Sequence, residues 1–224
     1  MIKLIAFDWN GTLFSDAQTI VNADNKLLKK FGIKPITIKK FRQSFHMPVI
    51  HYWKNIGLSD SFLKKNLNEM ESLFTSYYEP LADKARTRSG VREILKFFSE
   101  NKIQSIVYSN HTTVNIEKQL RRLKINHQIH KVLARALGDN SQIHTRTKET
   151  KLLNFVKEHK FKPDQVISVG DTEEEIEIGK QYGYHTVAIT GGYNTTARLT
   201  KHKPDFLIHN MKELIGIVKK LNKL

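Results

Sequence analysis

The stretch that decides the fold is Met1 to Asp16, which reads Met-Ile-Lys-Leu-Ile-Ala-Phe-Asp-Trp-Asn-Gly-Thr-Leu-Phe-Ser-Asp. Its apolar run stops at Asp8 and is followed by the turn signal Asn10-Gly11. A short apolar run with such a boundary is typical of a buried strand in a parallel sheet. Ligands bind beyond the carboxyl ends of such strands, so we expect chemistry at Asp8. Thr12 would offer its hydroxyl and N–H to an anion.

The pattern changes after this strand. Residues 17–83 have apolar side chains at helical spacing and no convincing strand, which predicts a small helical bundle inserted after the first strand. From Gly90 onward, expected strands alternate with helix-length segments. This alternation predicts an α/β fold with a parallel sheet and helices on both faces. The expected later strands cover residues 103–108, 129–134, 166–169, 185–189 and 206–208.

The composition describes an ordinary globular chain. Hydrophobic residues make up 39% and charged residues 26% of its 224 residues. No apolar stretch approaches the roughly 18 residues of a membrane span, so we expect no membrane role. The sequence has no Cys, which excludes disulfides and a Cys nucleophile and fits a reducing compartment. We therefore expect a cytoplasmic protein.

The net charge of +15 could attract phosphorylated substrates, anionic lipid or nucleic acid. The basic residues, however, are spread over many expected helices, as at Lys29-Lys30 and Lys219-Lys220, with no long run interleaved with aromatics. This distribution favours solvated helix faces over a nucleic-acid interface. His127 and His130 lack the spacing of a helical zinc pair.

Three expected strands end in polar groups, namely Asp8, Ser109-Asn110 and Asp171. A parallel sheet would bring these strand ends to one edge and make a single site from distant residues. Each end taken alone also fits a helix cap, because Ser, Asn and Asp are common caps. Taken together with a nearby basic residue, they favour a shared site.

The segment Asp-X-Asn-Gly-Thr-Leu resembles the first motif of the haloacid dehalogenase superfamily, normally Asp-X-Asp-Gly-Thr, whose first Asp is the nucleophile. Ser109 resembles the second motif and Lys148 the third, with Lys151 as the alternative. Gly170-Asp171 resembles the fourth motif, with Glu175 in place of the more usual second Asp. The variant first motif, together with Phe45-His46-Met47-Pro48 and Tyr52, is similar to a branch described as phosphoglycolate-phosphatase-like.

The resemblance implies a Rossmann-like core domain (residues 1–16 and 84–224) and an inserted helical cap domain (residues 17–83). It implies a Mg²⁺-dependent phosphatase of small phosphorylated substrates that acts through a phosphoaspartyl intermediate. The oligomeric state stays open between monomer and homodimer.

Each site residue has an expected role. Asp8, Asn10, Ser109 and Lys148 form the expected catalytic set, while Thr12, Ser109, Asn110 and Lys148 form the substrate-binding set. Asp8, Asp171 and the backbone carbonyl of Asn10 offer the hard oxygen ligands that Mg²⁺ prefers. Glu175 is expected to orient Lys148 or a metal-bound water. Glu173, Glu174 and Glu177 are interpreted as favourable placements in the first turns of a helix.

Asn10 stands where the family's general acid/base would be. An amide can hydrogen-bond a leaving oxygen but cannot transfer a proton to it, so turnover would be weakened, least of all for acyl or aryl phosphates. One alternative is a phosphate-ligand-binding or regulatory protein with little turnover. Another is a phosphonate-type hydrolase with a Schiff-base lysine in the cap, where the candidates are Lys29, Lys30, Lys39, Lys40 and Lys54.

Overall fold

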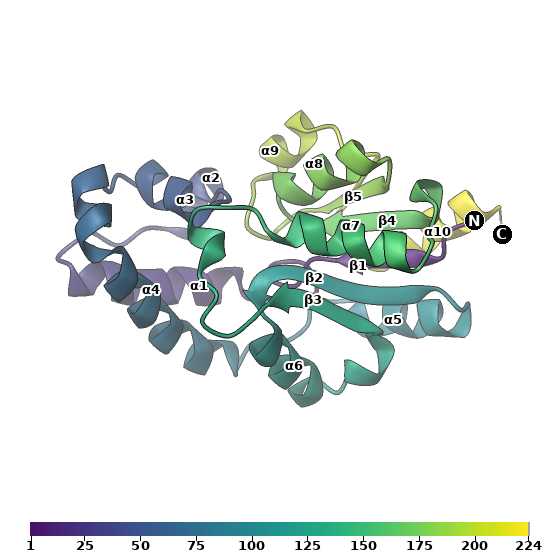
Figure 1. Ribbon diagram of the computed structural model, residues 1–224, viewed down its shortest axis with the longest axis horizontal. Helices are drawn as coiled ribbons and strands as arrows, with labels where there is room; N and C mark the ends of the chain where they lie inside the picture. Colours follow the sequence, from purple (N-terminus) through teal and green to yellow (C-terminus); the bar gives the residue numbers. More distant parts are fainter. Residues whose placement is uncertain (224) are drawn as a thin grey trace.

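The computed structural model describes residues 1–223 and contains one six-stranded parallel sheet. The strands lie in the order β3-β2-β1-β4-β5-β6 (Figure 1). This arrangement confirms the predicted α/β fold class. The strand bounds are β1 Leu4–Phe7, β2 Gln104–Thr112, β3 Lys131–Arg135, β4 Val166–Gly170, β5 His185–Ile189 and β6 Phe206–Ile208.

Helices cover both faces of the sheet, and β1 shows why. Ile5 and Phe7 pack against α5 (Val91–Glu100), α6 (Thr113–Arg122) and α10 (Glu213–Asn222). Leu4 and Ala6 point to the other face, against α7 (Lys148–Glu158) and α8 (Glu173–Tyr182). Successive side chains of a strand alternate between faces, so a strand buried on both faces reads as a continuous apolar run.

The register brings the polar strand ends to one edge. Phe7 pairs with Val107 of β2 and with Val169 of β4, so Asp8, Ser109 and Asp171 all follow this level of the sheet. The chain order reverses on either side of β1, and this switch point is where open α/β sheets bind ligands.

Four consecutive helices follow β1 and form the helical insertion (residues 17–82). They are α1 Ala17–Lys30, α2 Ile38–Ser44, α3 Val49–Asn55 and α4 Asp60–Ala82. The insertion has a hydrophobic cluster of its own, built around Phe41, Tyr52 and Trp53. It lies to one side of the sheet in Figure 1. The division into core and cap domains at these boundaries stays a prediction.

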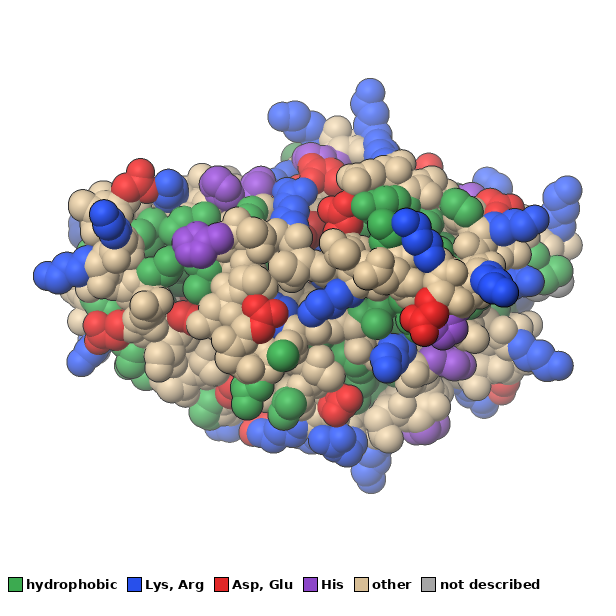
Figure 2. Space-filling view, in the orientation of Figure 1, with side chains coloured by type: hydrophobic (Ala, Val, Ile, Leu, Met, Phe, Trp, Pro, Cys, Tyr) green, Lys and Arg blue, Asp and Glu red, His purple; other side chains and the backbone are tan. Residues whose placement is uncertain are grey.

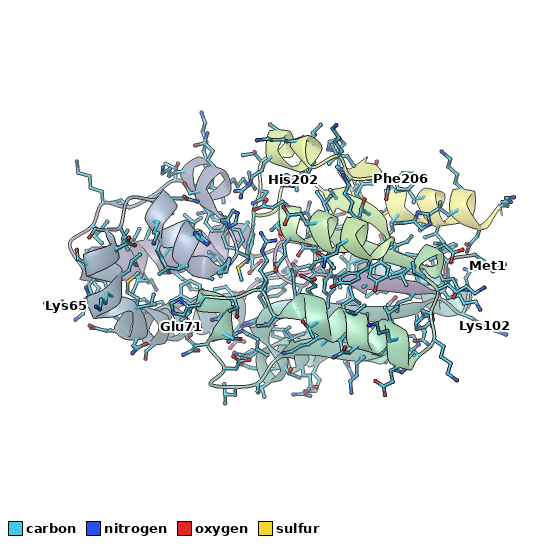
Figure 3. The ribbon with its side chains drawn as sticks, turned by 45° about the horizontal axis from the view of Figure 1, so that its top comes forward. Met1, Lys65, Glu71, Lys102, His202 and Phe206 are labelled. Carbon is cyan, nitrogen blue, oxygen red and sulfur yellow. The ribbon has the colours of Figure 1, made fainter. Side chains whose placement is uncertain are left out.

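The carboxyl ends of the strands face the insertion. Figure 3 places Met1 and Lys102, which lie just before β1 and β2, together at the end of the molecule opposite Lys65 of α4. Parallel strands that start at one end must finish at the other. The polar strand ends are therefore directed toward the insertion.

The structure departs from the expected elements at three places. β2 continues to Thr112, past Asn110, because it pairs with Arg135 of β3 after a register shift. α4 continues through Pro80, since the missing proline N–H affects only the final helical turn. The sequence analysis also missed the short helix α9 (Thr196–Lys201), in which Leu199 is the buried residue.

Among residues 1–223, no helix is long and apolar enough to cross a membrane. Lys and Arg side chains are spread over the visible face in Figure 2 and do not gather in one patch there. The remaining short segments are the 3₁₀ turns at residues 126–128, 141–143 and 163–165.

Candidate active site

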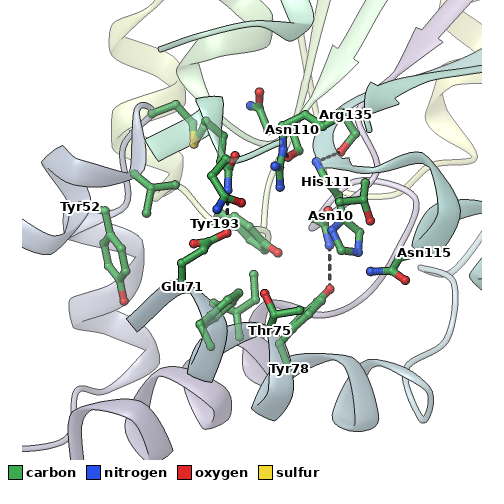
Figure 4. Close-up of a pocket in the computed structure, with 18 of the residues that line it drawn as sticks. Asn10, Tyr52, Glu71, Thr75, Tyr78, Asn110, His111, Asn115, Arg135 and Tyr193 are labelled. Carbon is green, nitrogen blue, oxygen red and sulfur yellow. Dashed lines mark hydrogen bonds between the residues drawn. The ribbon is translucent and has the colours of Figure 1, made fainter. Parts of the chain in front are cut away.

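A cavity of about 480 Å³ lies between the carboxyl edge of the sheet and the helical insertion. Asp8, Ser109 and Lys148 line it from the sheet side. Residues of α1 to α4 line the other side, as the close-up in Figure 4 shows for Tyr52 and Glu71. The structure therefore brings residues from distant parts of the chain around one cavity.

Lys148 is the centre of a buried ionic cluster. It is only 2% exposed, and its Nζ lies 3.1 Å from Asp8 Oδ1 and 3.1 Å from Glu174 Oε2. It also donates to Glu175 Oε1. Burial alone would lower the pKa of Lys148, but Asp8, Glu174 and Glu175 raise it well above its usual value. Lys148 is therefore a permanent cation beside Asp8.

The carboxyl groups of this cluster outnumber its cations. Asp8 faces Lys148, and the nearby charges of Glu175 and Asp171 add to burial in raising the pKa of Asp8, against the lowering effect of Lys148. Burial, and then Glu175, raise the pKa of Asp171 to about 7. Buried carboxyls that repel one another in this way are stabilised by a cation.

The oxygen donors fit Mg²⁺. The backbone carbonyl of Asn10 accepts no hydrogen bond within residues 1–223, and Asp8 uses only Oδ1 toward Lys148. No three His, Cys, Asp or Glu side chains in this range form a protein metal cage. Mg²⁺ is usually bound by one or two carboxylates plus waters, so two aspartates and a carbonyl match its needs better than those of zinc or calcium.

Thr12 does not line the cavity, contrary to its expected role as a substrate ligand. Its hydroxyl donates to Asp171 Oδ1 at 2.5 Å, and its N–H donates to Trp9 O at 3.3 Å. The second oxygen of Asp171 accepts from the Tyr193 N–H at 2.6 Å. A Cβ at Gly11 would come within 2.3 Å of Asp171 Oδ2, so glycine lets this backbone approach the carboxylate. Thr12 thus holds Asp171 and has no free donor for an anion.

Asn10 lines the cavity, but both donors of its amide are used, and Figure 4 shows the bond to Tyr78. Its Nδ2 donates to Asp16 Oδ2 and to the Tyr78 hydroxyl, at 2.8 Å each. Asp16 also accepts from the hydroxyls of Tyr78 and Tyr193 and from the Gly11 N–H. The amide nitrogen of Asn10 therefore has no hydrogen left for a leaving oxygen, which the sequence analysis had considered. Asp16, Tyr78 and Tyr193 carried no motif by which the sequence could reveal this network.

Ser109 and Asn110 both line the cavity at the end of β2. The Ser109 oxygen accepts the His111 N–H at 3.2 Å, which leaves the Ser109 hydroxyl hydrogen free. Asn110 Nδ2 donates to Glu174 Oε2 at 2.8 Å. Glu174 therefore touches both Lys148 and Asn110, although the sequence analysis gave it only a helix-terminus role. Nothing in a run of three glutamates shows that Glu174 reaches Lys148 together with Glu175.

The other charged residues of these motifs lie elsewhere. Lys151 Nζ donates to Ala134 O at 2.6 Å, so Lys148 and not Lys151 reaches Asp8. Glu173 pairs with Arg198, and Glu177 pairs with Arg146. Glu175 combines two contacts, because its second oxygen also accepts from the N–H and hydroxyl of Thr172. Lys148 is therefore oriented from the first turn of α8.

Comparisons with known proteins identify the family of this chain. The family model for haloacid dehalogenase-like hydrolases matches residues 5–189. The chain belongs to this family. A phosphoglycolate phosphatase from Haemophilus influenzae is 24% identical over 223 residues, covering 96% of this chain and 98% of the relative.

Solved structures show the same fold. A haloacid dehalogenase-like family hydrolase from Streptococcus pneumoniae has a TM-score of 0.82 at 22% identity, covering 97% of this chain and 98% of the other. A protein from Clostridium acetobutylicum, described as a predicted phosphatase, has a TM-score of 0.82 at 16% identity and full coverage of both chains, 100% each. At such low identities the likeness concerns the fold alone.

Proposed function

We propose that this family member is a Mg²⁺-dependent phosphatase of small phosphate esters that forms a phosphoaspartyl intermediate on Asp8. The observation that carries the proposal is the pair of Asp8 and Lys148 on the wall of the cavity, with an Nζ to Oδ1 distance of 3.1 Å. The Haemophilus influenzae relative, named a phosphoglycolate phosphatase, supports the same reaction class.

In the first step an Asp8 oxygen attacks phosphorus, and the bond from phosphorus to the ester oxygen breaks. Lys148 offsets the negative charge that Asp8 would otherwise present to a phosphate dianion. The free hydrogen of the Ser109 hydroxyl can donate to a phosphoryl oxygen. Such positioning and electrostatic stabilisation dominate phosphoryl transfer. In the second step water attacks the phosphoaspartate, which releases phosphate and regenerates Asp8.

Mg²⁺, held by Asp8, Asp171 and the carbonyl of Asn10, would neutralise charge on the transferred phosphoryl group. Thr12 orients Asp171 from behind through its hydroxyl. Glu175 and Glu174 fix the position of the Lys148 ammonium group. The helical insertion, as a cap domain, would cover the site and exclude water.

The two alternatives differ in their support. Both amide hydrogens of Asn10 are already donated to Asp16 and Tyr78, so Asn10 cannot assist the leaving oxygen and turnover is expected to be weak. A phosphate-binding protein with little turnover is therefore the second candidate. A phosphonate-type reaction needs a lysine of the insertion at the cavity. Within residues 17–82, all of which are described, no lysine lines it.

The test is phosphate release from a panel of phosphate esters with Mg²⁺, for the wild type and Asp8→Asn. We expect wild-type turnover and a loss of about 10⁴-fold or more in Asp8→Asn, because removal of a nucleophile abolishes the covalent route. Circular dichroism checks that both proteins fold alike. Equal phosphate release from both proteins would contradict the proposal, and tight binding without turnover would favour the second candidate.

A further inference from the structure

The cavity is acidic although the chain has a net charge of +15. Within residues 1–223, six carboxyl groups line it, and the Lys and Arg side chains that do so are Lys148 and Arg135. Lys148 belongs to the cluster around Asp8. The charge of Lys148 is therefore taken up by this cluster and does not neutralise carboxyl groups in the part of the cavity away from Asp8.

The insertion side of the cavity carries no basic residue. Within residues 17–82, no Lys or Arg lines it, whereas Asp24, Glu71 and Glu79 do. The basic side chains of the insertion bind elsewhere: Arg42, for example, donates to the carbonyls of Gly191 and Gly192, each at 2.8 Å. A carboxylate on the far end of a substrate would meet carboxyl groups here and no Lys or Arg side chain of residues 17–82.

Glu71 is the acidic residue that reaches into the cavity from the middle of α4 (Figure 4). Its Oε1 accepts from Gln142 Nε2 at 2.8 Å, and Oε2 makes no hydrogen bond within residues 1–223. Glu71 therefore has a carboxylate oxygen available for a ligand.

Within residues 1–223, Arg135 is the Lys or Arg side chain that lines the cavity away from the Asp8 cluster, and it lies near two carboxyl groups. It is 6% exposed, and its Nε donates to the carbonyl of Asn110 at 2.5 Å. Burial lowers the pKa of Arg135, and the nearby charges of Glu71 and Asp139 oppose this lowering. A substrate carboxylate would have to compete with Glu71 for this guanidinium.

A second carboxyl group lies on this wall with an oxygen that has no partner among the described residues. Asp24 is fully buried and accepts from the Tyr52 hydroxyl at 2.5 Å through Oδ2. Its other oxygen, Oδ1, has no hydrogen-bond partner within residues 1–223. Together, Asp24 and Glu71 favour a positive or hydrogen-bond-donating group over an anion.

The walls between the two ends are aromatic. Phe41, Phe45, Trp53 and Phe74 line the cavity from the insertion. Flat rings pack well against one another in such a space. Asn10 can give no proton to a leaving oxygen, so an alcohol that leaves readily as its anion is favoured. A phenol, with a pKa of about 10 as in tyrosine, leaves more readily than an alkyl alcohol.

We propose that this cavity selects an aryl phosphate whose ring carries an ammonium-bearing side chain, with the phosphate at Asp8 and Lys148 and the ammonium group at Glu71. The proposal rests on the proposed function for the identity of the phosphate end. It separates this chain from relatives named for phosphoglycolate, whose substrate ends in a carboxylate.

The experiment compares two esters of matched ring and opposite charge, tyramine phosphate and the phosphate of para-hydroxyphenylacetate. We expect wild-type kcat/KM to be about tenfold or more higher for tyramine phosphate, since a hydrogen bond to a charged group discriminates by about this factor. Glu71→Gln should lower this ratio by about tenfold. Equal rates, or a preference for the carboxylate ester, would overturn the proposal.

Glu69→Gln is the matched control, because Glu69 is an exposed residue of the same helix and does not line the cavity. It removes the same charge from α4 and should leave the ratio of the two esters as in the wild type. If Glu69→Gln and Glu71→Gln lower the ratio equally, the effect is general electrostatics and the assignment of Glu71 fails.

A binding measurement tests the selectivity for an ammonium group separately from the phosphatase activity. Calorimetry measures both esters on Asp8→Asn, which cannot turn them over. If the wild type hydrolyses neither these two esters nor any ester of the panel, the phosphatase proposal fails, yet tenfold tighter binding of tyramine phosphate would still support the selectivity. Equal binding of the two esters would overturn the selectivity even if both are hydrolysed.

Discussion

The two walls of the cavity are built in opposite ways. The sheet wall gathers Asp8, Ser109 and Lys148 from three distant points of the sequence, at the ends of strands and the start of a helix. The insertion wall consists mainly of side chains from four consecutive helices, such as Phe41, Trp53 and Glu71. Topology fixes the first wall, whereas packing fixes the second. The chemistry can therefore be inferred from strand ends, but selectivity requires the positions of individual side chains.

The largest stability effect is expected on the sheet wall. Lys148→Met should lower the free energy of unfolding by about 3–5 kcal/mol, because it leaves Asp8, Glu174 and Glu175 buried without their cation. Urea unfolding measures this. Lys151→Met, on the same helix, should cost only about 1 kcal/mol. Equal losses would show that the carboxyl cluster does not depend on Lys148.

Asp171→Asn should lower the rate of phosphate release by about 10²–10³-fold, since it removes a proposed Mg²⁺ ligand. Thr12→Val, which removes only the hydrogen bond to Asp171, should lower the rate of phosphate release by about 10–100-fold. Isothermal titration with Mg²⁺ should show weaker binding in the same order, and EDTA should stop wild-type turnover. Unchanged Mg²⁺ binding in Asp171→Asn would remove Asp171 from the metal site.

On the insertion wall, Asp24 should make stability depend on pH. Burial raises the pKa of Asp24 to about 7, against the hydrogen bond from Tyr52, whereas an unfolded Asp titrates near about 4. The folded state thus binds the proton more tightly, and its contribution to stability is present below pH about 4 and is lost as pH rises to about 7.

Asp24→Asn should remove this pH dependence, which amounts to a change in unfolding free energy on the order of 3 kcal/mol between pH about 4 and about 7. The measurement is the difference in unfolding free energy between wild type and variant at several pH values. Asp60→Asn, at an exposed aspartate of the insertion, should give a nearly constant difference. A constant difference for Asp24→Asn as well would show that this carboxyl is ionised in the folded protein.

The smallest effect concerns the boundary between the walls. Asn10→Asp replaces a donor with an acceptor beside Asp16 and should lower stability by about 1–3 kcal/mol. The double variant Asn10→Asp/Asp16→Asn should recover most of this loss. Because the new carboxyl can carry a proton, release of phosphate from alkyl esters should rise, by up to about 10²-fold. A variant as stable as the wild type would contradict the hydrogen-bond network described for Asp16.

The sequence predicted much of the sheet wall. The apolar run before Asp8 and the polar groups after β2 predicted that Asp8 and Ser109 lie together, and both line one cavity. Lys148, which lines the same cavity, was predicted only from the resemblance to the family's third motif. Thr12 was assigned wrongly, because sequence does not say whether a hydroxyl faces a ligand or a buried carboxylate. Glu174 was missed for a similar reason, since the sequence does not say which glutamates of this helix turn contact Lys148.

The insertion wall could not be predicted in the same way. Helical spacing identified its four helices, but amphipathic patterns mark every residue that is buried, including residues far from the cavity. Asp24 is an example: its polar side chain lies on the buried face of α1 and contacts Tyr52 of α3. That contact depends on how two helices pack, and no local pattern records it.

The hydrogen bonds of Asp16 also have a mechanical consequence. Asp16 directly precedes α1, and Tyr78 lies near the end of α4, so one carboxylate fastens the chain both where it enters and where it leaves the insertion. A rotation of the insertion that preserves these bonds must turn about this point. Displacements grow with distance from such a pivot, so the end of the insertion near Lys65 would travel farthest, while Asn10 would hardly move (Figure 3).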